Sequence, residues 1–95
     1  MFEKTIVQRG YRVTGRVQGV FFRAWTRDTA LKLGLGGTVQ NLPDGSVITH
    51  VVGPVSSVER MEARLWEGPP ASRVDGVEAV DSSHSVNRDS FEILY

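Results

Sequence analysis

Two stretches of this 95-residue chain carry apolar residues at helical spacing, and each lies between stretches in which apolar and polar residues alternate. In 22–33 and again in 55–65, apolar residues recur every three or four positions along one face, which predicts two helices. The alternating stretches predict strands. These strands are expected at 5–14, 37–41, 46–53, 74–80 and 91–95.

The predicted order is strand, helix, strand, strand, helix, strand, followed by a short C-terminal strand. It matches the ferredoxin-like split β-α-β sandwich (βαββαβ), an α+β fold in which two helices cover one face of an antiparallel sheet. A chain of 95 residues predicts one domain, 1–95, because a second domain could not bury a core of its own. Such folds serve carriers, RNA binders, regulatory modules and enzymes, so the function must be sought in a site.

Glycine and cap residues predict where the elements bend or end. Gly10 interrupts the first strand and predicts a β-bulge there. Gly34 follows the first helix and tolerates the left-handed conformation that ends many helices. The sequence "LPDG" at 42–45 predicts the turn of a hairpin. Ser56 and Glu59 have the spacing of a capping box at the start of the second helix.

The composition excludes several kinds of site. No cysteine is present, so disulfides, thiolate metal sites and a thiol nucleophile are excluded. The formal net charge is zero, so no overall basic field favours nucleic acid or an anionic membrane, and any anion site must be local. The histidines, His50 and His84, are far apart in the sequence and lack the spacing of metal ligands, so we assign no metal. The N-terminal segment lacks the features of a secretory signal, which leaves the cytoplasm as the expected compartment.

Common catalytic motifs are also missing. The segment "GYRVTGRV" at 10–17 has the glycine spacing of a P-loop, but Arg16 and Val17 stand where lysine and serine or threonine are required. The acidic residues form no obvious pair for acid and base catalysis, and Asp44 is explained as a turn residue.

The segment "GRVQGVFFR" at 15–23 leads from the first strand into the first helix without a preferred cap residue. A glycine-rich turn at a helix N-terminus can direct several backbone N–H groups at a phosphate or carboxylate, and the helix dipole favours the negative charge. Arg23 lies in the first turn, from which its guanidinium can reach back and bind two anion oxygens. The plain alternative is a strand-to-helix turn with a solvated arginine.

Asn41 ends a predicted strand, where an asparagine is by itself a common turn residue. Four segments change this interpretation because they occur together and in order. They are "GRVQGVFFR" at 15–23, "LGLGGTVQNLPDGSV" at 33–47, "GPP" at 68–70 and "FEILY" at 91–95. Over nearly its whole length, the chain resembles the acylphosphatase family.

The resemblance implies hydrolysis of the carboxyl–phosphate bond of a small acyl phosphate to a carboxylate and inorganic phosphate, which also acts as a competitive ligand. It implies a monomer that needs neither a cofactor nor a metal and that binds neither nucleic acid nor a membrane. In the family, the arginine that matches Arg23 binds the phosphate, and the asparagine that matches Asn41 orients the attacking water. The phosphate loop matches Gly15, Arg16, Val17, Gln18, Gly19 and Val20.

Two positions depart from the family pattern. Thr38 stands where many members carry a bulkier residue such as tryptophan, and Ile48 stands where an acidic residue is frequent. Neither matches a catalytic residue, so both bear on substrate preference or stability.

Two other functions fit the predicted fold. A regulatory domain that binds anions without catalysis would bind phosphate yet release none from an acyl phosphate. An RNA-recognition module would need exposed aromatic residues on its central strands and a basic surface. The segment "ITHVV" at 48–52 contains no aromatic ring of that kind, and the net charge is zero, so the RNA interpretation is disfavoured.

Overall fold

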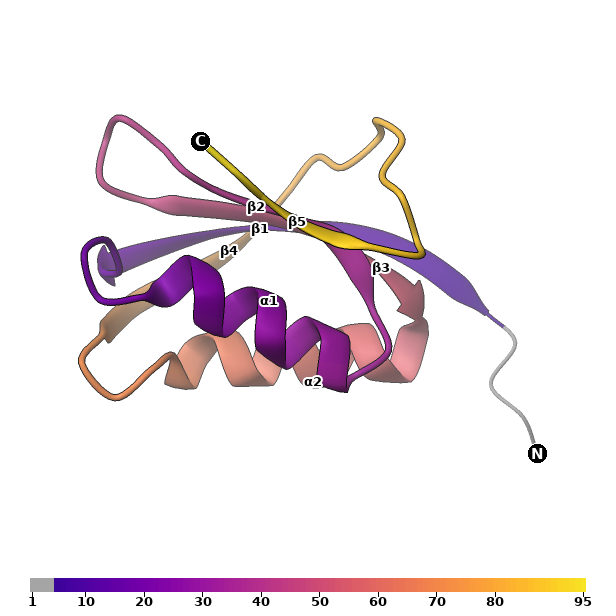
Figure 1. Ribbon diagram of the computed structural model, residues 1–95, viewed down its shortest axis with the longest axis horizontal. Coiled ribbons are helices and arrows are strands. Elements are labelled where there is room, and N and C mark those ends of the chain that lie inside the picture. Colours follow the sequence, from indigo (N-terminus) through magenta and orange to yellow (C-terminus); the bar gives the residue numbers. More distant parts are fainter. Residues whose placement is uncertain (1–4) are drawn as a thin grey trace.

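A five-stranded sheet covered on one face by two helices forms the structure, a computed structural model that describes residues 5–95 (Figure 1). The elements in chain order are β1 (Ile6–Arg16), α1 (Phe22–Lys32), β2 (Gly36–Asn41), β3 (Val47–Pro54), α2 (Val55–Glu67), β4 (Arg73–Val80) and β5 (Phe91–Leu94). The strand order is β4-β1-β3-β2-β5. The first four strands pair antiparallel, as predicted, whereas β5 pairs parallel with β2 and makes the sheet mixed.

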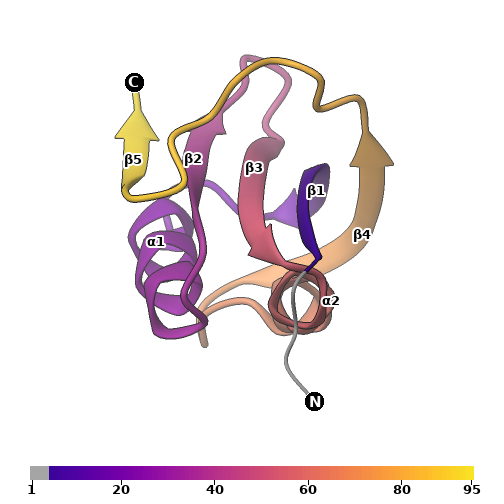
Figure 2. The same ribbon diagram turned by 90° about the vertical axis from the view of Figure 1, so that its right-hand side faces the viewer.

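The core lies between the sheet and the two helices. Figure 2 shows α1 beneath the β2 and β5 side of the sheet and α2 beneath the β1 and β4 side. The predicted face of α2 is confirmed, since Val58, Met61 and Leu65 are fully buried. In α1 the predicted residues Phe22 and Ala30 are buried. Strand valines complete the core, among them Val13, Val39, Val47 and Val51. Within the described residues, neither helix is long and apolar enough to cross a membrane.

The predicted end of α1 and the predicted hairpin are both confirmed. Gly34 has φ 75°, and the backbone N–H of Leu35 donates to the carbonyl of Ala30 over 2.9 Å, which satisfies a carbonyl at the end of the helix. In the turn between β2 and β3, the carboxylate of Asp44 accepts hydrogen bonds from the backbone N–H of Ser46 (2.9 Å) and from its hydroxyl (2.6 Å).

The irregularity in β1 lies at Gly15, so the predicted bulge at Gly10 is wrong. The pairing of β1 with β4 shifts between Thr14 and Gly15, whereas Gly10 is in regular register with both neighbouring strands. Gly10 has a different steric role, because a Cβ there would lie 2.9 Å from ring atoms of His50. A glycine within an alternating strand pattern can therefore provide space for a side chain of the neighbouring strand in the sheet.

The start of α2 also differs from the prediction. Pro54 is the N-cap residue, and no side chain caps the helix. Ser56 is already the second residue of α2, so the predicted capping box is wrong. The reason is that β3 runs through Pro54 directly into the helix, without the extra residues that would place Ser56 at the cap.

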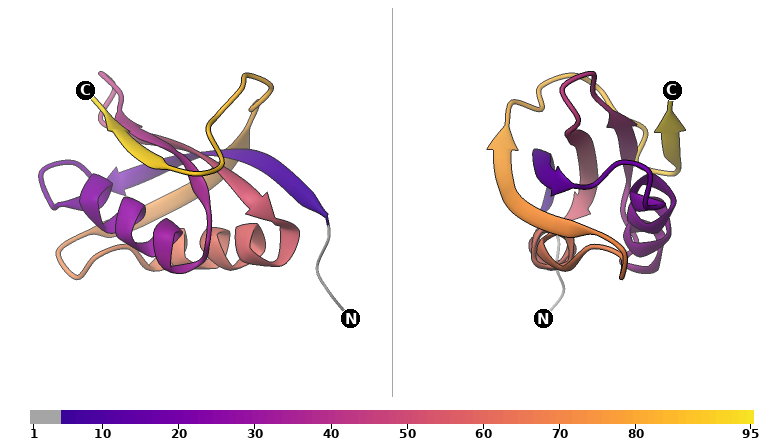
Figure 3. Two further views of the ribbon diagram at one scale, coloured as in Figure 1. Left: turned by 45° about the vertical axis from the view of Figure 1, so that its right-hand side comes forward. Right: turned by 90° about the vertical axis from the view of Figure 1, so that its left-hand side faces the viewer.

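The connection from β4 to β5, residues 81–90, crosses the face of the sheet opposite the helices (Figure 3). It joins one edge of the sheet to the other, since β4 and β5 are the two outer strands. We call this segment the crossover. It brings β5 beside β2 and close to α1, where the candidate site lies.

Candidate functional site

One pocket of about 360 Å³ lies where the segment after β1, the end of β2 and the end of the chain after β5 meet. It contains both residues of the predicted pair, Arg23 and Asn41. The full lining is Val17, Gly19, Phe21, Phe22, Arg23, Ala24, Asn41, Ile93 and Tyr95. Arg23 has the one charged side chain in this lining, so no acidic or imidazole side chain of the pocket competes for an anion.

The loop between β1 and α1 is fixed by apolar anchors and leaves its backbone donors free. Val17 and Val20 are buried in the core on either side of Gly19. Gly19 has φ 74°, and no heavy atom beyond its own and those of its chain neighbours lies within 4 Å of where its Cβ would be. Among the described residues, the backbone N–H groups from Val17 to Phe22 donate to no other backbone group. Such free donors next to a helix N-terminus suit a tetrahedral anion.

The predicted absence of a cap at the start of α1 is confirmed. Phe21 is the N-cap residue, with φ 61°, ψ 25° and no side-chain cap. It is the only residue other than glycine with a positive φ in the described part of the chain, and its ring is 85% exposed. A bulky residue in the left-handed region costs about 1–2 kcal/mol. The chain therefore accepts local strain at the pocket.

The guanidinium of Arg23 packs against an aromatic ring. Its central carbon lies 4.8 Å from the centroid of the Tyr95 ring, a cation–π contact. Among the ion pairs formed by the described residues, none includes Arg23. Because the N–H donors of a guanidinium lie in its plane, contact with the ring face leaves donors available for an anion.

The side chain of Asn41 contributes an acceptor without a partner. Asn41 is the last residue of β2, opposite Val47 of β3, and lines the pocket. Its Oδ1 atom is buried and accepts no hydrogen bond from any described residue. A buried acceptor left in this state is unfavourable, so a hydrogen-bond donor from a bound molecule would satisfy it.

The side chain of Gln18 connects the two halves of the site. Its Nε2 donates to the carbonyl of Leu42 over 2.9 Å and to that of Ser46 over 2.8 Å. The loop after β1 is thereby tied to the turn that begins directly after Asn41. Sequence reasoning placed Gln18 in the loop but did not find this bond, because nothing in the sequence pairs a glutamine with a distant carbonyl.

The predicted loop residues have different places in the structure. Val17 and Gly19 line the pocket, whereas Arg16, Gln18 and Val20 are not among its lining residues. Gly15 lines a neighbouring depression, where a Cβ at this position would lie 2.2 Å from the carbonyl oxygen of Arg73. Gly15 therefore permits a close approach of two strands.

Hydrogen bonds and an ion pair of Asp44 stabilise the turn between β2 and β3, which borders this depression. Hydrogen bonds from Ser46, followed by the ion pair with Arg12, keep the pKa of the Asp44 carboxyl below its usual range. The turn behind Asn41 thus stays charged and tied to β1 at neutral pH. Within the described residues, no group of three or more His, Cys, Asp or Glu side chains could hold a metal ion.

Ile93 and Tyr95 are pocket residues that sequence reasoning did not assign. Their alternation with Phe91 predicted a strand but gave no partner for it. The parallel pairing of β5 with β2 brings both residues beside Arg23 and Asn41.

Comparison with known proteins gives a consistent result. A sequence model of the acylphosphatase family matches residues 9–93. The chain is similar to an acylphosphatase of Rhizobium meliloti, with 46% identity over 82 residues that cover 86% of each protein. It is similar in structure to an acylphosphatase from Coxiella burnetii (TM-score 0.86, 34% identity, 94% of this chain and 93% of that chain). It is equally similar to the one from Bacillus subtilis (TM-score 0.86, 32% identity, 96% and 100%).

We expect Gln18→Ala to weaken the binding of inorganic phosphate roughly tenfold, because two hydrogen bonds between the loop and the turn are lost. Isothermal titration with phosphate measures the effect. Gln40→Ala is the matched control, since the side chain of Gln40 forms no hydrogen bond with the described residues, and it should leave the affinity unchanged. Equal affinities of the two variants would contradict the role of Gln18 as a tether.

Proposed function

Because this chain belongs to the acylphosphatase family and is an enzyme with that activity, we propose that hydrolysis takes place in the pocket around Arg23. In this proposal the loop N–H groups and Arg23 hold the phosphate of an acyl phosphate, and Asn41 orients the attacking water. One observation carries the proposal: Arg23, Asn41 and Gly19 line the same pocket.

The leaving group explains why the pocket needs no general acid. Cleavage of the carboxyl–phosphate bond releases a carboxylate, and carboxyl groups of this kind have a pKa of about 4. At neutral pH such a leaving group departs as the anion and requires no proton. This agrees with a lining whose one charged side chain is that of Arg23.

Fixed hydrogen-bond donors of the loop and of Arg23 would bind and stabilise the phosphoryl group. Phosphoryl transfer depends mainly on positioning and on stabilisation of charge on the equatorial oxygens. The free N–H groups from Val17 to Phe22 and the Arg23 guanidinium supply such donors without having to reorganise. In the proposed complex, the phosphate acts as the missing cap of α1.

Asn41 has the chemistry to hold water but not to activate it. A carboxamide neither takes a proton at neutral pH nor attacks phosphorus, but its oxygen accepts a hydrogen bond from water. The unpartnered Oδ1 of Asn41 would accept that bond and hold the water in line with phosphorus. The substrate phosphate then takes up the proton that the water loses.

The apolar side chains of the pocket suggest where the acyl group lies. Phe21 and Tyr95 are 85% and 93% exposed, and both line the pocket together with Ile93. Exposed aromatic rings beside an anion site gain contact area when an apolar group binds. We therefore propose that these three residues contact the acyl group.

The experiment that tests the proposed function is phosphate release from acetyl phosphate in the presence of excess chelator. Catalytic release supports the proposal, whereas binding of phosphate without any release would favour the regulatory anion-binding domain. The proposal retains a monomer and the cytoplasm as the compartment.

Arg23→Lys should lower kcat/KM roughly 100-fold or more, although the charge is kept, because a point charge cannot replace the planar fork of donors. Arg27→Lys on the same helix is the matched control, since Arg27 is exposed and pairs with Asp28. Steady-state kinetics with acetyl phosphate measures both variants. Near wild-type turnover in Arg23→Lys would disprove the role of Arg23.

Asn41→Ala should lower kcat roughly 100-fold and change the inhibition constant of phosphate less than about threefold, because the lost group positions water and not phosphate. Gln40→Ala, at the position before Asn41 in β2 and outside the pocket lining, is the control and should behave as wild type. If phosphate inhibition weakened in parallel with kcat, Asn41 would be a binding or folding residue instead.

Phe21→Ala should reduce the preference for benzoyl phosphate over acetyl phosphate, measured as the ratio of kcat/KM values, roughly tenfold. Phe21→Tyr keeps the aromatic ring and should retain the ratio. Trp66→Ala removes a half-exposed aromatic ring of α2 away from the pocket and serves as a second control. An unchanged ratio in Phe21→Ala would show that this ring does not contact the acyl group.

A further inference from the structure

A polar cluster fastens the crossover to the open face of the sheet. Gln8 of β1 donates through Nε2 to the carbonyl of Ser82 (3.0 Å), the hydroxyl of Ser82 (3.0 Å) and the carbonyl of His84 (2.5 Å). The hydroxyl of Ser82 also lies 2.7 Å from Nδ1 of His50 on β3. These four bonds join the first half of the crossover to strands in the middle of the sheet.

The two histidines, far apart in the sequence, meet in this cluster. The ring centroids of His50 and His84 are 4.4 Å apart, and the ring planes meet at 80°. His50 is only 9% exposed, whereas His84 lies on the exposed crossover. The ring of His50 fits here because its partner on β1 is Gly10, whose hydrogen leaves space for it.

The crossover leads directly into β5. Strand β5 is an edge strand that pairs with β2 alone, through four residues from Phe91 to Leu94. The backbone N–H of Gly37 bonds the carbonyl of Ser90 over 2.9 Å, so the second half of the crossover is anchored separately. Ile93 and Tyr95, which follow this anchor, form one wall of the pocket.

We propose that His50 and His84 form a pH-sensitive latch, closed when both rings are neutral and opened by acid, which fastens the crossover and through it β5. Two imidazolium rings 4.4 Å apart would repel each other, and a charged His50 would be poorly solvated beneath the crossover. The proposal goes beyond the proposed function, since the cluster lies outside the catalytic pocket.

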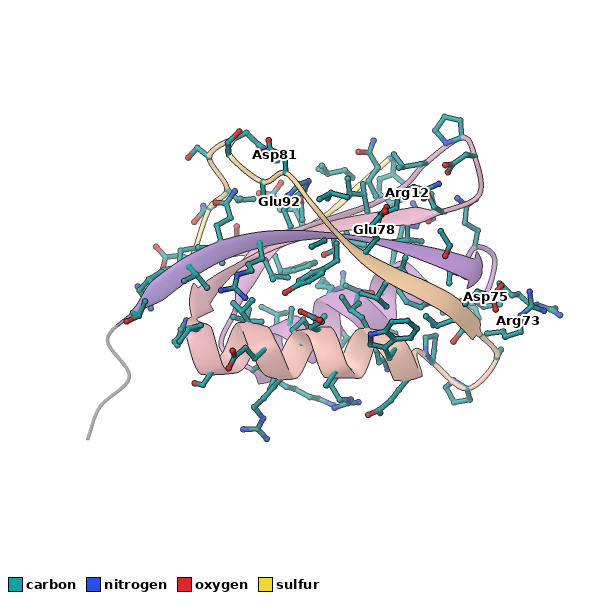
Figure 4. The ribbon with its side chains drawn as sticks, turned by 180° about the vertical axis from the view of Figure 1, so that it is seen from behind. Arg12, Arg73, Asp75, Glu78, Asp81 and Glu92 are labelled. Carbon is teal, nitrogen blue, oxygen red and sulfur yellow. The ribbon has the colours of Figure 1, made fainter. Side chains whose placement is uncertain are left out.

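The groups that face His50 determine whether its protonation favours the open or the closed latch. From the crossover, His84 and Asp81 face it; from β1 and β2, its register partners are the uncharged Gly10 and Thr38. Figure 4 shows Asp81 where the chain leaves β4. The next charged residues on the flanking strands are Arg12, Glu78 and Glu92.

Protonation therefore favours the open latch. Burial lowers the pKa of His50, positive charge on His84 lowers it further, and Asp81 raises it. With its pKa below the ordinary value of about 6.5, His50 binds a proton less readily in the closed latch than in the open one. The closed state is thus stable above about pH 6.5 and loses stability as the pH falls through the lowered pKa.

Hydrogen exchange of the whole chain at pH 7.5 and pH 5.5 tests the latch. Protection factors of backbone amides in residues 81–94 should fall roughly tenfold at the lower pH, as expected for uptake of one proton over one pH unit. In His50→Gln, whose side chain takes up no proton in this pH range, they should change less than about threefold, and in His84→Gln, which leaves His50 buried, the fall should be smaller than in wild type. Amides of α2, which packs on β1, β3 and β4, are the internal control and should not respond.

A second variant tests the direction in which the pH of opening shifts. Asp81→Asn removes the carboxylate that favours a charged His50, so a lower pH should be needed to protonate His50 in the closed state and the open state should gain population at a higher pH. Equal pH responses in wild type and His50→Gln would overturn the latch, as would a shift of opening to lower pH in Asp81→Asn.

Discussion

The backbone N–H groups at the start of α1, left without acceptors, are the constraint on which the site depends. Phe21, the N-cap residue, has no side-chain group that could cap them, and Val17 and Val20 fix the loop by burial in the core. The strain at Phe21 is unfavourable in the free protein, and the unpaired donors remain available for an anion. Gln18 holds the facing turn, so Asn41 is positioned relative to these donors by hydrogen bonds and not by the loop alone.

Local patterns predicted most of the fold because they report burial directly. The apolar faces of α1 and α2 and the turn around Asp44 depend on residues close in sequence. Prediction failed where two explanations share one local signal. A glycine inside a strand indicates either a bulge or space for a neighbouring side chain, and only the position of His50 assigns the second explanation to Gly10. Ser56 shows the same ambiguity, since capping depends on where β3 ends.

The candidate site was predictable only in part for a related reason. Arg23 and the loop form a continuous segment, and Asn41 ends the next strand, so one β-α-β unit brings them together. Ile93 and Tyr95 reach the pocket through parallel pairing of strands separated by some fifty residues, as the register of Val39 with Ile93 illustrates. No local pattern encodes such pairing, and the contact between His50 and His84 escaped prediction in the same way.

Because β5 pairs parallel with β2, two distant segments of the chain line the pocket, and each is proposed to contact a different part of the substrate. In the proposed mechanism, everything that handles phosphorus comes from residues 15–41, whereas much of the wall that meets the organic part of the substrate comes from residues 93–95. These segments contact each other but are encoded at opposite ends of the sequence. Substitutions at Ile93 can therefore alter which molecules are accepted while the residues that handle phosphorus stay the same, whereas Tyr95, which packs on Arg23, couples substrate range to reaction type.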